Sequence, residues 1–367
     1  MILPGSDLNS IAAGVVAIRA GCLLGFPTET VYGLAADADN NAAVAQIFTA
    51  KGRPADHPLI VHVADASAVA HYASDVPDFA VQLMQAFWPG PLTLILPRRP
   101  GVANAASGGN PTIGLRCPSH PVAQALLQSL FNGGQIPINS QAENAPAKQL
   151  ESDPIYFIYL KVWGLAAPSA NQFGRVSPTT AAHVQGEFGD DLLILDGGAC
   201  SVGIESTILD CTRGAPVLLR PGAITPAQVQ AVCGLTVRMK DEALTQDAPA
   251  PKASGTLESH YAPRARVRLM GASDLQASVD AFGALDGREI AAGGVPPLAI
   301  YARTRLKLPT AQILCRRMPD DAIVTAQQLF AVLRELDAQA VSQIWIETPP
   351  ASPEWNGVRD RLQRAAG

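Results

Sequence analysis

The sequence contains little charge and no long apolar run. Only 16% of its 367 residues are Asp, Glu, Lys or Arg, whereas 48% are hydrophobic, and the net charge is −5. This composition is typical of a well-buried globular protein rather than a disordered one. The negative balance argues against broad binding of nucleic-acid phosphates, which needs a positive face. Because no stretch reaches the about eighteen consecutive apolar residues of a membrane span, none is expected.

Targeting signals and familiar catalytic motifs are also missing. The apolar stretch at 11–18 is short, has no basic lead and is better explained as an amphipathic surface helix, so we expect a cytoplasmic protein. The six cysteines are scattered without a C-x-x-C pair. This favours reduced, mostly buried thiols over disulfides or a zinc site. Neither a Walker A motif nor a nucleophile elbow is present.

Alternating helical and strand patterns divide the chain into two units. Residues 1–236 mix short apolar strands with amphipathic helices, which predicts an α/β or α+β domain. Residues 237–263 are polar, rich in Ala and Pro and nearly free of large aliphatic side chains, which predicts a linker. Residues 264–367 alternate again and predict a small doubly wound α/β domain. This second unit has no G-x-G-x-x-G, so it does not indicate a dinucleotide.

Polar residues gather in six short clusters that each follow an expected strand or helix. The clusters are FPTETVYGL (26–34), AKGRPADHPLIVH (50–62), TIGLRCP (112–118), PSANQFGRVSP (168–178), GIEST (203–207) and LLRPG (218–222). Each has a structural alternative when taken alone. Thr28 and Thr30 can cap the following turn, Lys51 and Arg53 suit the negative end of a helix dipole, and His62 can be an ordinary core histidine.

The six clusters together indicate an anion site. Four of them supply a cation at the edge of a strand or helix, in a chain where charge is scarce. Small residues around them let a ligand approach backbone N–H groups, which bind oxygen anions. Arginine offers a bidentate fork to phosphate or carboxylate, and lysine offers a mobile point charge. Cations, hydroxyls and exposed backbone without a nucleophile suit a polyphosphate and a carboxylate held side by side.

These clusters, together with WPGPLTLIL and HYAP, resemble the threonylcarbamoyl-AMP synthase family in its long form. They occur in the family order and span nearly the whole chain. The resemblance implies a YrdC-like twisted mixed-sheet α/β catalytic domain at 1–236 and a linker or lid at 237–263. It further implies a small Rossmann-like doubly wound C-terminal domain at 264–367.

The resemblance also implies a reaction. The family joins L-threonine, bicarbonate or CO2, and ATP to give threonylcarbamoyl-AMP and pyrophosphate. A downstream tRNA threonylcarbamoyl-transferase system then modifies N6 of adenosine 37 in tRNA. Mg²⁺ is expected to enter with ATP, without a dedicated protein metal site. Neither membrane association nor strong direct nucleic-acid binding is expected.

The implied site residues fall into two groups. Residues expected to bind threonine are Thr30, His62, Arg116, Ala167 and Ser206. Residues expected to bind ATP are Arg53, His57, Thr112, Ser169, Ser177, Arg220 and Tyr261. Arg116 is expected to pair with the threonine carboxylate. Lys51 and Arg53 are the expected catalytic residues, and we hypothesise that the charge of Lys51 stabilises the transition state.

The sequence departs from the family pattern in an insert at about 131–163. The insert ends in the aromatic run YFIYLKVW. A surface excursion with its aromatic end packed down is one interpretation, and an extra strand or interaction patch is another.

Two other functions compete with the synthase. One is an RNA-binding module without catalysis, which would need a contiguous basic face. The other is a carbamoyl-transfer protein acting on carbamoyl phosphate, whose relatives carry further large domains. No such domains are recognisable in this sequence.

Overall fold

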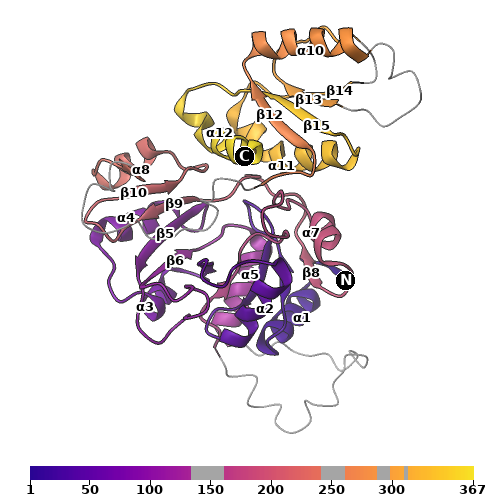
Figure 1. Cartoon of the computed structure of the whole chain (residues 1–367). Helices are drawn as coiled ribbons and strands as arrows, with labels where there is room; N and C mark the ends of the chain where they lie inside the picture. Colours follow the sequence, from indigo (N-terminus) through magenta and orange to yellow (C-terminus); the bar gives the residue numbers. More distant parts are fainter. Residues whose placement is uncertain (134–160, 241–260, 287–297, 310–312) are drawn as a thin grey trace.

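The computed structural model describes residues 1–133, 161–240, 261–286, 298–309 and 313–367. Within these ranges it contains an eleven-stranded sheet and a four-stranded sheet, each with helices on both faces (Figure 1). The central part of the predicted insert and most of the predicted linker lie outside the described residues.

The first sheet is mixed, with strand order β1-β8-β2-β3-β7-β4-β6-β5-β9-β10-β11. Its strands are β1 (Ile2–Pro4), β2 (Leu24–Phe26), β3 (Gly33–Asp37), β4 (Ile60–His62), β5 (Leu92–Pro97), β6 (Thr112–Arg116), β7 (Leu165–Ala166), β8 (Leu193–Asp196), β9 (Thr207–Asp210), β10 (Val217–Arg220) and β11 (Arg238–Met239). Because β11 pairs with β10, the first residues of the predicted linker lie on the edge of this sheet.

Helices cover both faces of the first sheet. They are α1 (Leu8–Arg19), α2 (Asn41–Lys51), α3 (Val69–Tyr72), α4 (Asp78–Phe87), α5 (Pro121–Phe131), α7 (Ala181–Phe188) and α8 (Pro226–Cys233). Helices α1 and α5 share one buried core with the sheet, and the remaining helices share another. None of the helices in the described ranges is long and apolar enough to cross a bilayer.

The C-terminal domain is a parallel sheet in the order β12-β15-β13-β14, as expected for a doubly wound unit. Its elements are β12 (Arg266–Met270), α10 (Ala272–Asp286), β13 (Leu298–Ala302), β14 (Leu314–Arg317), α11 (Ala322–Ala338), β15 (Gln343–Glu347) and α12 (Asn356–Ala366). In Figure 1, α10 covers the outer face, whereas α11 and α12 lie between the sheet and the first domain.

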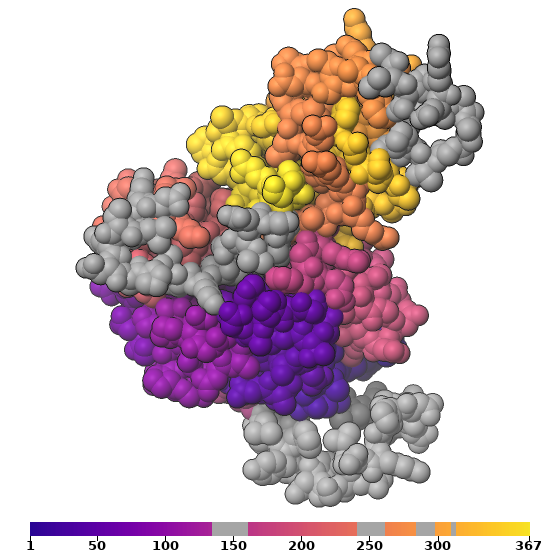
Figure 2. Space-filling model, in the orientation of Figure 1, coloured from indigo at the N-terminus to yellow at the C-terminus, as the bar shows by residue number. Residues whose placement is uncertain are grey.

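The two domains share a hydrophobic core. Val31, Val176 and Ile204 of the first domain belong to the same buried cluster as α11 and α12. Gly203 allows the closest approach, because a Cβ atom built on it would lie 2.2 Å from the carbonyl oxygen of Gln327 in α11. The space-filling view shows the orange and yellow C-terminal domain resting on the pink part of the first domain (Figure 2). The C-terminal domain therefore packs directly on the loops that carry predicted site residues.

The ends of two elements follow from local sequence. β2 ends at Phe26, directly before Pro27, and α2 ends at Lys51 because Gly52 adopts a left-handed φ of 63°. All six cysteines are free, as predicted, although only Cys117, Cys200 and Cys211 are fully buried.

The end of the predicted insert packs down. Trp163 stacks on His71 with the ring centroids 4.5 Å apart, and the Lys161 ammonium lies over the Phe131 ring. Residues 134–160 of the insert lie outside the described residues. The choice between its two interpretations therefore stays a prediction.

Candidate active site

A small cavity lies where the carboxyl ends of β4, β6 and β10 meet the loop before β9. Its volume is about 40 Å³. Thr28 and Glu205 contribute to its wall together with many of the predicted site residues. The predicted residues that line it are Arg53, His62, Arg116, Ala167, Ser169, Ser206, Arg220 and Tyr261. Segments far apart in the sequence therefore converge on one buried point.

Strand register brings His62 and Arg116 together. β4 and β6 are parallel neighbours, and these two residues are direct partners at the carboxyl ends of the strands. Burial, helped by the charge of Arg116, lowers the pKa of His62 to about 3. His62 is therefore a neutral imidazole at physiological pH, able to form hydrogen bonds but adding no charge.

A buried carboxylate holds Arg116 in place. Glu29 pairs with its Nη2 at 2.7 Å, and Nη1 donates to the Thr30 hydroxyl at 2.8 Å. Thr30 is itself fixed by Thr28 and lies behind Arg116 rather than in the cavity wall. A guanidinium has five N–H groups, so Arg116 keeps donors that can face a ligand. Thr28 also accepts from the Val31 N–H, as the structural interpretation expects. The role of Thr30 in threonine binding stays a prediction.

Ser206 and Arg220 form a second anchored pair. Nε and Nη2 of Arg220 donate to the Ser206 carbonyl at 3.1 and 2.9 Å, and Nη2 also reaches the Ser206 hydroxyl at 3.1 Å. The Thr93 hydroxyl lies 2.7 Å from the same Ser206 oxygen. These hydrogen bonds join Arg220 to neutral groups, whereas Arg116 is paired with the Glu29 carboxylate.

Lys51 is placed one layer behind the cavity. Its ammonium donates to the carbonyl of Ser169 at 2.6 Å and to that of Asn171. Burial, with the nearby charge of Arg53, lowers the pKa of Lys51 to about 7. Lys51 therefore fixes the PSAN backbone directly and does not line the cavity itself. Its role in stabilising the transition state stays a prediction.

Glu205, which the motif analysis passed over, links three segments. Its carboxylate accepts from the Ser177 hydroxyl at 2.5 Å and from Nε of Arg361 in α12 at 2.7 Å. Burial opposes its ionisation, but Arg361 and Arg220 hold the pKa of Glu205 below its ordinary value. Ser177 therefore supports the cavity wall through Glu205 rather than lining the cavity itself.

Tyr261 closes the cavity from the side of the C-terminal domain. It is 1% exposed, it packs on Phe330 with the ring centroids 5.3 Å apart, and the Arg361 guanidinium lies over its ring. Its φ of 64° is unusual for a bulky residue. Backbone conformations of this kind persist where the surrounding packing enforces them, often at functional sites.

Two predicted nucleotide residues lie away from the cavity. Thr112 begins β6, at the opposite end of the strand from Arg116, which corresponds to about 13 Å of extended chain. The His57 ring lies beside Phe173, with centroids 5.8 Å apart, and Arg53 approaches the same ring. The structure therefore brings neither Thr112 nor His57 to the cavity wall.

Two buried carboxylates near the site arginines, Glu29 and Glu205, were not among the predicted site residues. Glu29 and Glu205 stand inside the quoted PTET and GIEST segments, so carboxylates beside predicted ligands were the available signal. Among the described residues, no group of three or more His, Cys, Asp or Glu side chains is placed to hold a metal ion. Glu29 pairs with Arg116, and Glu205 pairs with Arg361.

Comparison with known proteins gives family matches for both parts of the chain. A family model for Sua5, YciO and YrdC, described as telomere recombination, matches residues 16–222. The C-terminal domain model of threonylcarbamoyl-AMP synthase matches residues 224–367. The chain is 35% identical to the threonylcarbamoyl-AMP synthase of Pyrococcus abyssi over 360 residues, covering 97% of this chain and 93% of that protein. It is equally similar to the Bacillus subtilis protein of the same name, over 362 residues and with the same coverage. The chain belongs to the threonylcarbamoyl-AMP synthase family.

Solved structures of the family have the same fold. The crystal structure of P. abyssi Sua5 complexed with L-threonine superposes with a TM-score of 0.79 at 32% identity, covering 98% of this chain and 95% of that one. The predicted family and the predicted combination of a YrdC-like domain with a C-terminal α/β domain are therefore confirmed. The roles of individual site residues stay predictions.

Proposed function

We propose that this chain is an L-threonylcarbamoyladenylate synthase. It forms threonylcarbamoyl-AMP and pyrophosphate from L-threonine, bicarbonate or CO2, and ATP. The observation that carries the proposal is the convergence of Arg53, Arg116 and Arg220 on one buried cavity beside neutral His62. Three guanidinium groups match a carboxylate and a triphosphate. The name shared by the curated relatives and the threonine-bound relative support it.

The proposed reaction has two bond-forming steps. The threonine amine loses a proton and attacks CO2, which gives a carbamate. A carbamate oxygen then attacks the α-phosphorus of ATP, the bond to the bridging oxygen breaks, and pyrophosphate leaves. Phosphoryl-type transfers of this kind depend on alignment and charge neutralisation more than on a covalent enzyme group.

The cavity residues supply those two requirements. Arg116 pairs with the threonine carboxylate, and His62 and Ser206 hold the polar groups of the threonine. These three residues meet at adjoining strand ends. Arg53 and Arg220 bind the phosphates. Burial lowers the pKa of Arg53 only to about 10, so Arg53 stays charged at neutral pH. Lys51 acts through the Ser169 and Asn171 carbonyls that it holds. Mg²⁺ is proposed to bind the ATP phosphates, with no resident protein ligands.

Substrate entry requires the cavity to open. Pockets for drug-sized ligands occupy roughly 300–1,000 Å³, whereas this cavity measures about 40 Å³. Tyr261 is the wall residue that belongs to the predicted linker, so its displacement is the proposed opening step. A truncation that deletes residues from Lys252 onward is then expected to lose catalysis. A folded truncation with unchanged activity would contradict this step.

Pyrophosphate release tests the proposed function. The purified chain is incubated with ATP and Mg²⁺, and release is measured with threonine, bicarbonate, both or neither, with serine in place of threonine as the control. Release only when both substrates are present supports a synthase. Release with carbamoyl phosphate in their place supports the carbamoyl-transfer alternative. Salt-sensitive RNA retention without ATP turnover supports the RNA-binding alternative.

The proposed next step, transfer to tRNA, is tested by adding tRNA and a transferase system to the product.

A further inference from the structure

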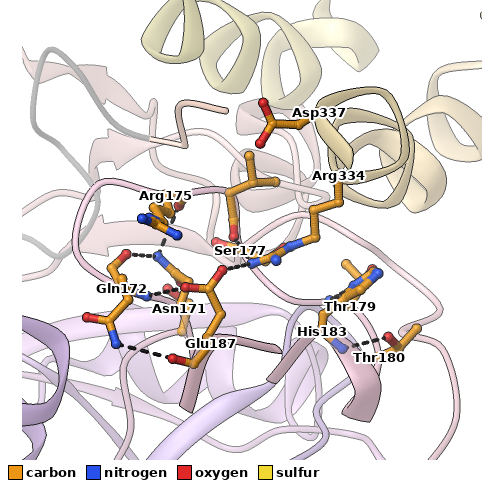
Figure 3. A network of polar contacts seen from close by, with 12 residues as sticks. Asn171, Gln172, Arg175, Ser177, Thr179, Thr180, His183, Glu187, Arg334 and Asp337 are labelled. Carbon is orange, nitrogen blue, oxygen red and sulfur yellow. Dashed lines mark hydrogen bonds and ion pairs between the residues drawn. The ribbon is translucent and has the colours of Figure 1, made fainter. Parts of the chain in front are cut away.

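A groove between the two domains lies outside the active site. It encloses about 520 Å³ and is lined by residues of α7, the 175–176 segment, the 262–264 segment and α11. Figure 3 shows the polar network along this groove, with Arg334 of α11 pointing across to the first domain. Arg334 and its partner Glu187 line this groove and not the active-site cavity.

Arg334 makes three contacts across the domain boundary. Its Nη2 lies 2.8 Å from Oε1 of Glu187 and also donates to the Val176 carbonyl. Its Nε lies 3.4 Å from the Ser177 carbonyl, a longer contact. The Arg334 and Glu187 side chains are only 18% and 6% exposed, so solvent screens this pair less than a surface pair.

Glu187 links Arg334 to the 169–177 loop, which carries active-site residues. Its second oxygen, Oε2, accepts from the backbone N–H of Gln172 at 3.0 Å, and its own carbonyl accepts from the Gln172 side chain at 3.4 Å. The Asn171 side chain then braces the loop from inside by donating to the carbonyls of Gln172 and Arg175 at 2.7 and 3.0 Å. One carboxylate therefore ties α11 to the 171–172 backbone.

The same loop presents the cavity residues. Ser169 lines the cavity, and the carbonyls of Ser169 and Asn171 hold the Lys51 ammonium. At the other end of the loop, the Ser177 hydroxyl donates to Glu205. The loop is thus held by Lys51 on the inner side and by Glu187 and Arg334 on the outer side.

We propose that Arg334 is a positioning residue for the adenylate-forming reaction. Through Glu187 it sets the conformation of the 169–177 loop, so the C-terminal domain controls the geometry of Ser169 and Lys51 from a point outside the cavity. This inference rests on the proposed function. A purely structural role would hold the domains together without changing the loop.

The test compares Arg334→Gln with a matched control, Arg317→Gln. Arg317 forms an exposed pair with Asp320 within the same domain, at 2.9 Å and with both side chains more than half exposed. Expected for Arg334→Gln is a roughly 10- to 100-fold loss of kcat for threonylcarbamoyl-AMP formation, because small misplacements of reacting groups have effects of this size. The KM for ATP should change less than kcat, Arg334→Lys should restore part of the rate, and Arg317→Gln should match the wild type.

Hydrogen exchange supplies the readout that does not depend on activity. Amides of 169–177 should exchange faster in Arg334→Gln and in Glu187→Gln, and the double variant should add little to either single change. Amides of β4 and β6 should be unchanged, which shows that the domain still folds. Unchanged exchange at 169–177 in Arg334→Gln overturns the inference, as does a kcat equal to that of Arg317→Gln. If the wild type makes no adenylate, the proposed function fails and the exchange comparison alone decides the coupling.

Discussion

The two walls of the cavity are built in different ways. On the wall formed by the first domain, His62 and Arg116 stand at the ends of paired strands, and Arg116 has a carboxylate partner from the same domain. On the opposite wall, Tyr261 is held by Phe330 and Arg361, both of which belong to the C-terminal domain. The first domain therefore supplies the charged groups, and docking of the second domain supplies the enclosure.

The first wall therefore carries the charged groups for the reaction, and the second wall controls access to the cavity. Groups fixed by a sheet keep their geometry as long as the first domain is folded. Groups fixed across a domain boundary keep it only while the domains stay docked, and boundaries of this kind commonly allow relative motion. Changes to the first wall should therefore remove activity outright, whereas changes at the domain boundary should lower activity by displacing the loops that docking holds in place.

The largest effect is expected from Arg116→Gln. It leaves Glu29 buried without its cation, which is expected to cost about 3–5 kcal/mol of unfolding free energy, and adenylate formation should fall below detection. The double variant Glu29→Gln/Arg116→Gln should regain much of the stability but none of the activity. Urea denaturation and pyrophosphate release measure the two quantities. Activity in the stabilised double variant would show that the first wall does not carry the chemistry.

The next effect concerns the domain boundary. Gly203→Ala places a Cβ atom 2.2 Å from the Gln327 carbonyl oxygen at a φ of 79°, so the domains should separate and activity should fall at least tenfold. Gly214→Ala is the matched control, because its φ is 73° and nothing lies within 4 Å of the added atom. It should lose only the roughly 1–2 kcal/mol of left-handed backbone strain and keep its activity. Equal activity losses in both variants would remove the role assigned to docking.

A smaller effect should follow the titration of Lys51. Burial lowers its pKa from 10.5 to about 7, so between these values the unfolded chain binds a proton that the native protein does not. The unfolding free energy of the wild type should then rise with pH from about 7 to about 10 relative to Lys51→Met. Urea denaturation of both proteins at pH 6, 7, 8 and 9 measures the difference. A difference that does not change with pH would show that the Lys51 pKa is not lowered.

The smallest effect concerns His62, whose pKa is lowered from 6.5 to about 3 by burial and by Arg116. Below pH 6.5 His62 is protonated in the unfolded chain, whereas in the native protein it stays neutral until about pH 3. The free energy of unfolding therefore falls as the pH falls. His62→Gln should reduce this fall between pH 6 and pH 4 and leave the difference flat above pH 7.5. If the free energy of unfolding falls equally with falling pH in the two proteins, His62 is more exposed and its pKa is not lowered.

Local sequence predicted the framework of the first wall. The clusters at 50–62 and 112–118 each contain an apolar run that forms a strand, β4 or β6, and the carboxyl ends of these parallel strands meet at one edge of the sheet. A glycine after Lys51 ended α2 where the pattern expected. The order of the motifs along the chain was enough to indicate the family. Thr112 shares β6 with Arg116 but stands at the other end of the strand, so its predicted contact with the nucleotide stays a prediction.

Only the tertiary structure decided which charges pair across the molecule. Arg361 reaches Glu205 from 156 residues away, and Arg334 reaches Glu187 from 147 residues away. Nothing local marks Arg361 as buried, since it lies in the arginine-rich helix NGVRDRLQRAA and yet has no exposed surface. Periodicity and capping act within a few residues, so the sequence alone determined the elements and the motifs that they carry. Pairing of buried charges depends on which surfaces pack together, and that was settled when α11 and α12 docked on the loops of the first domain.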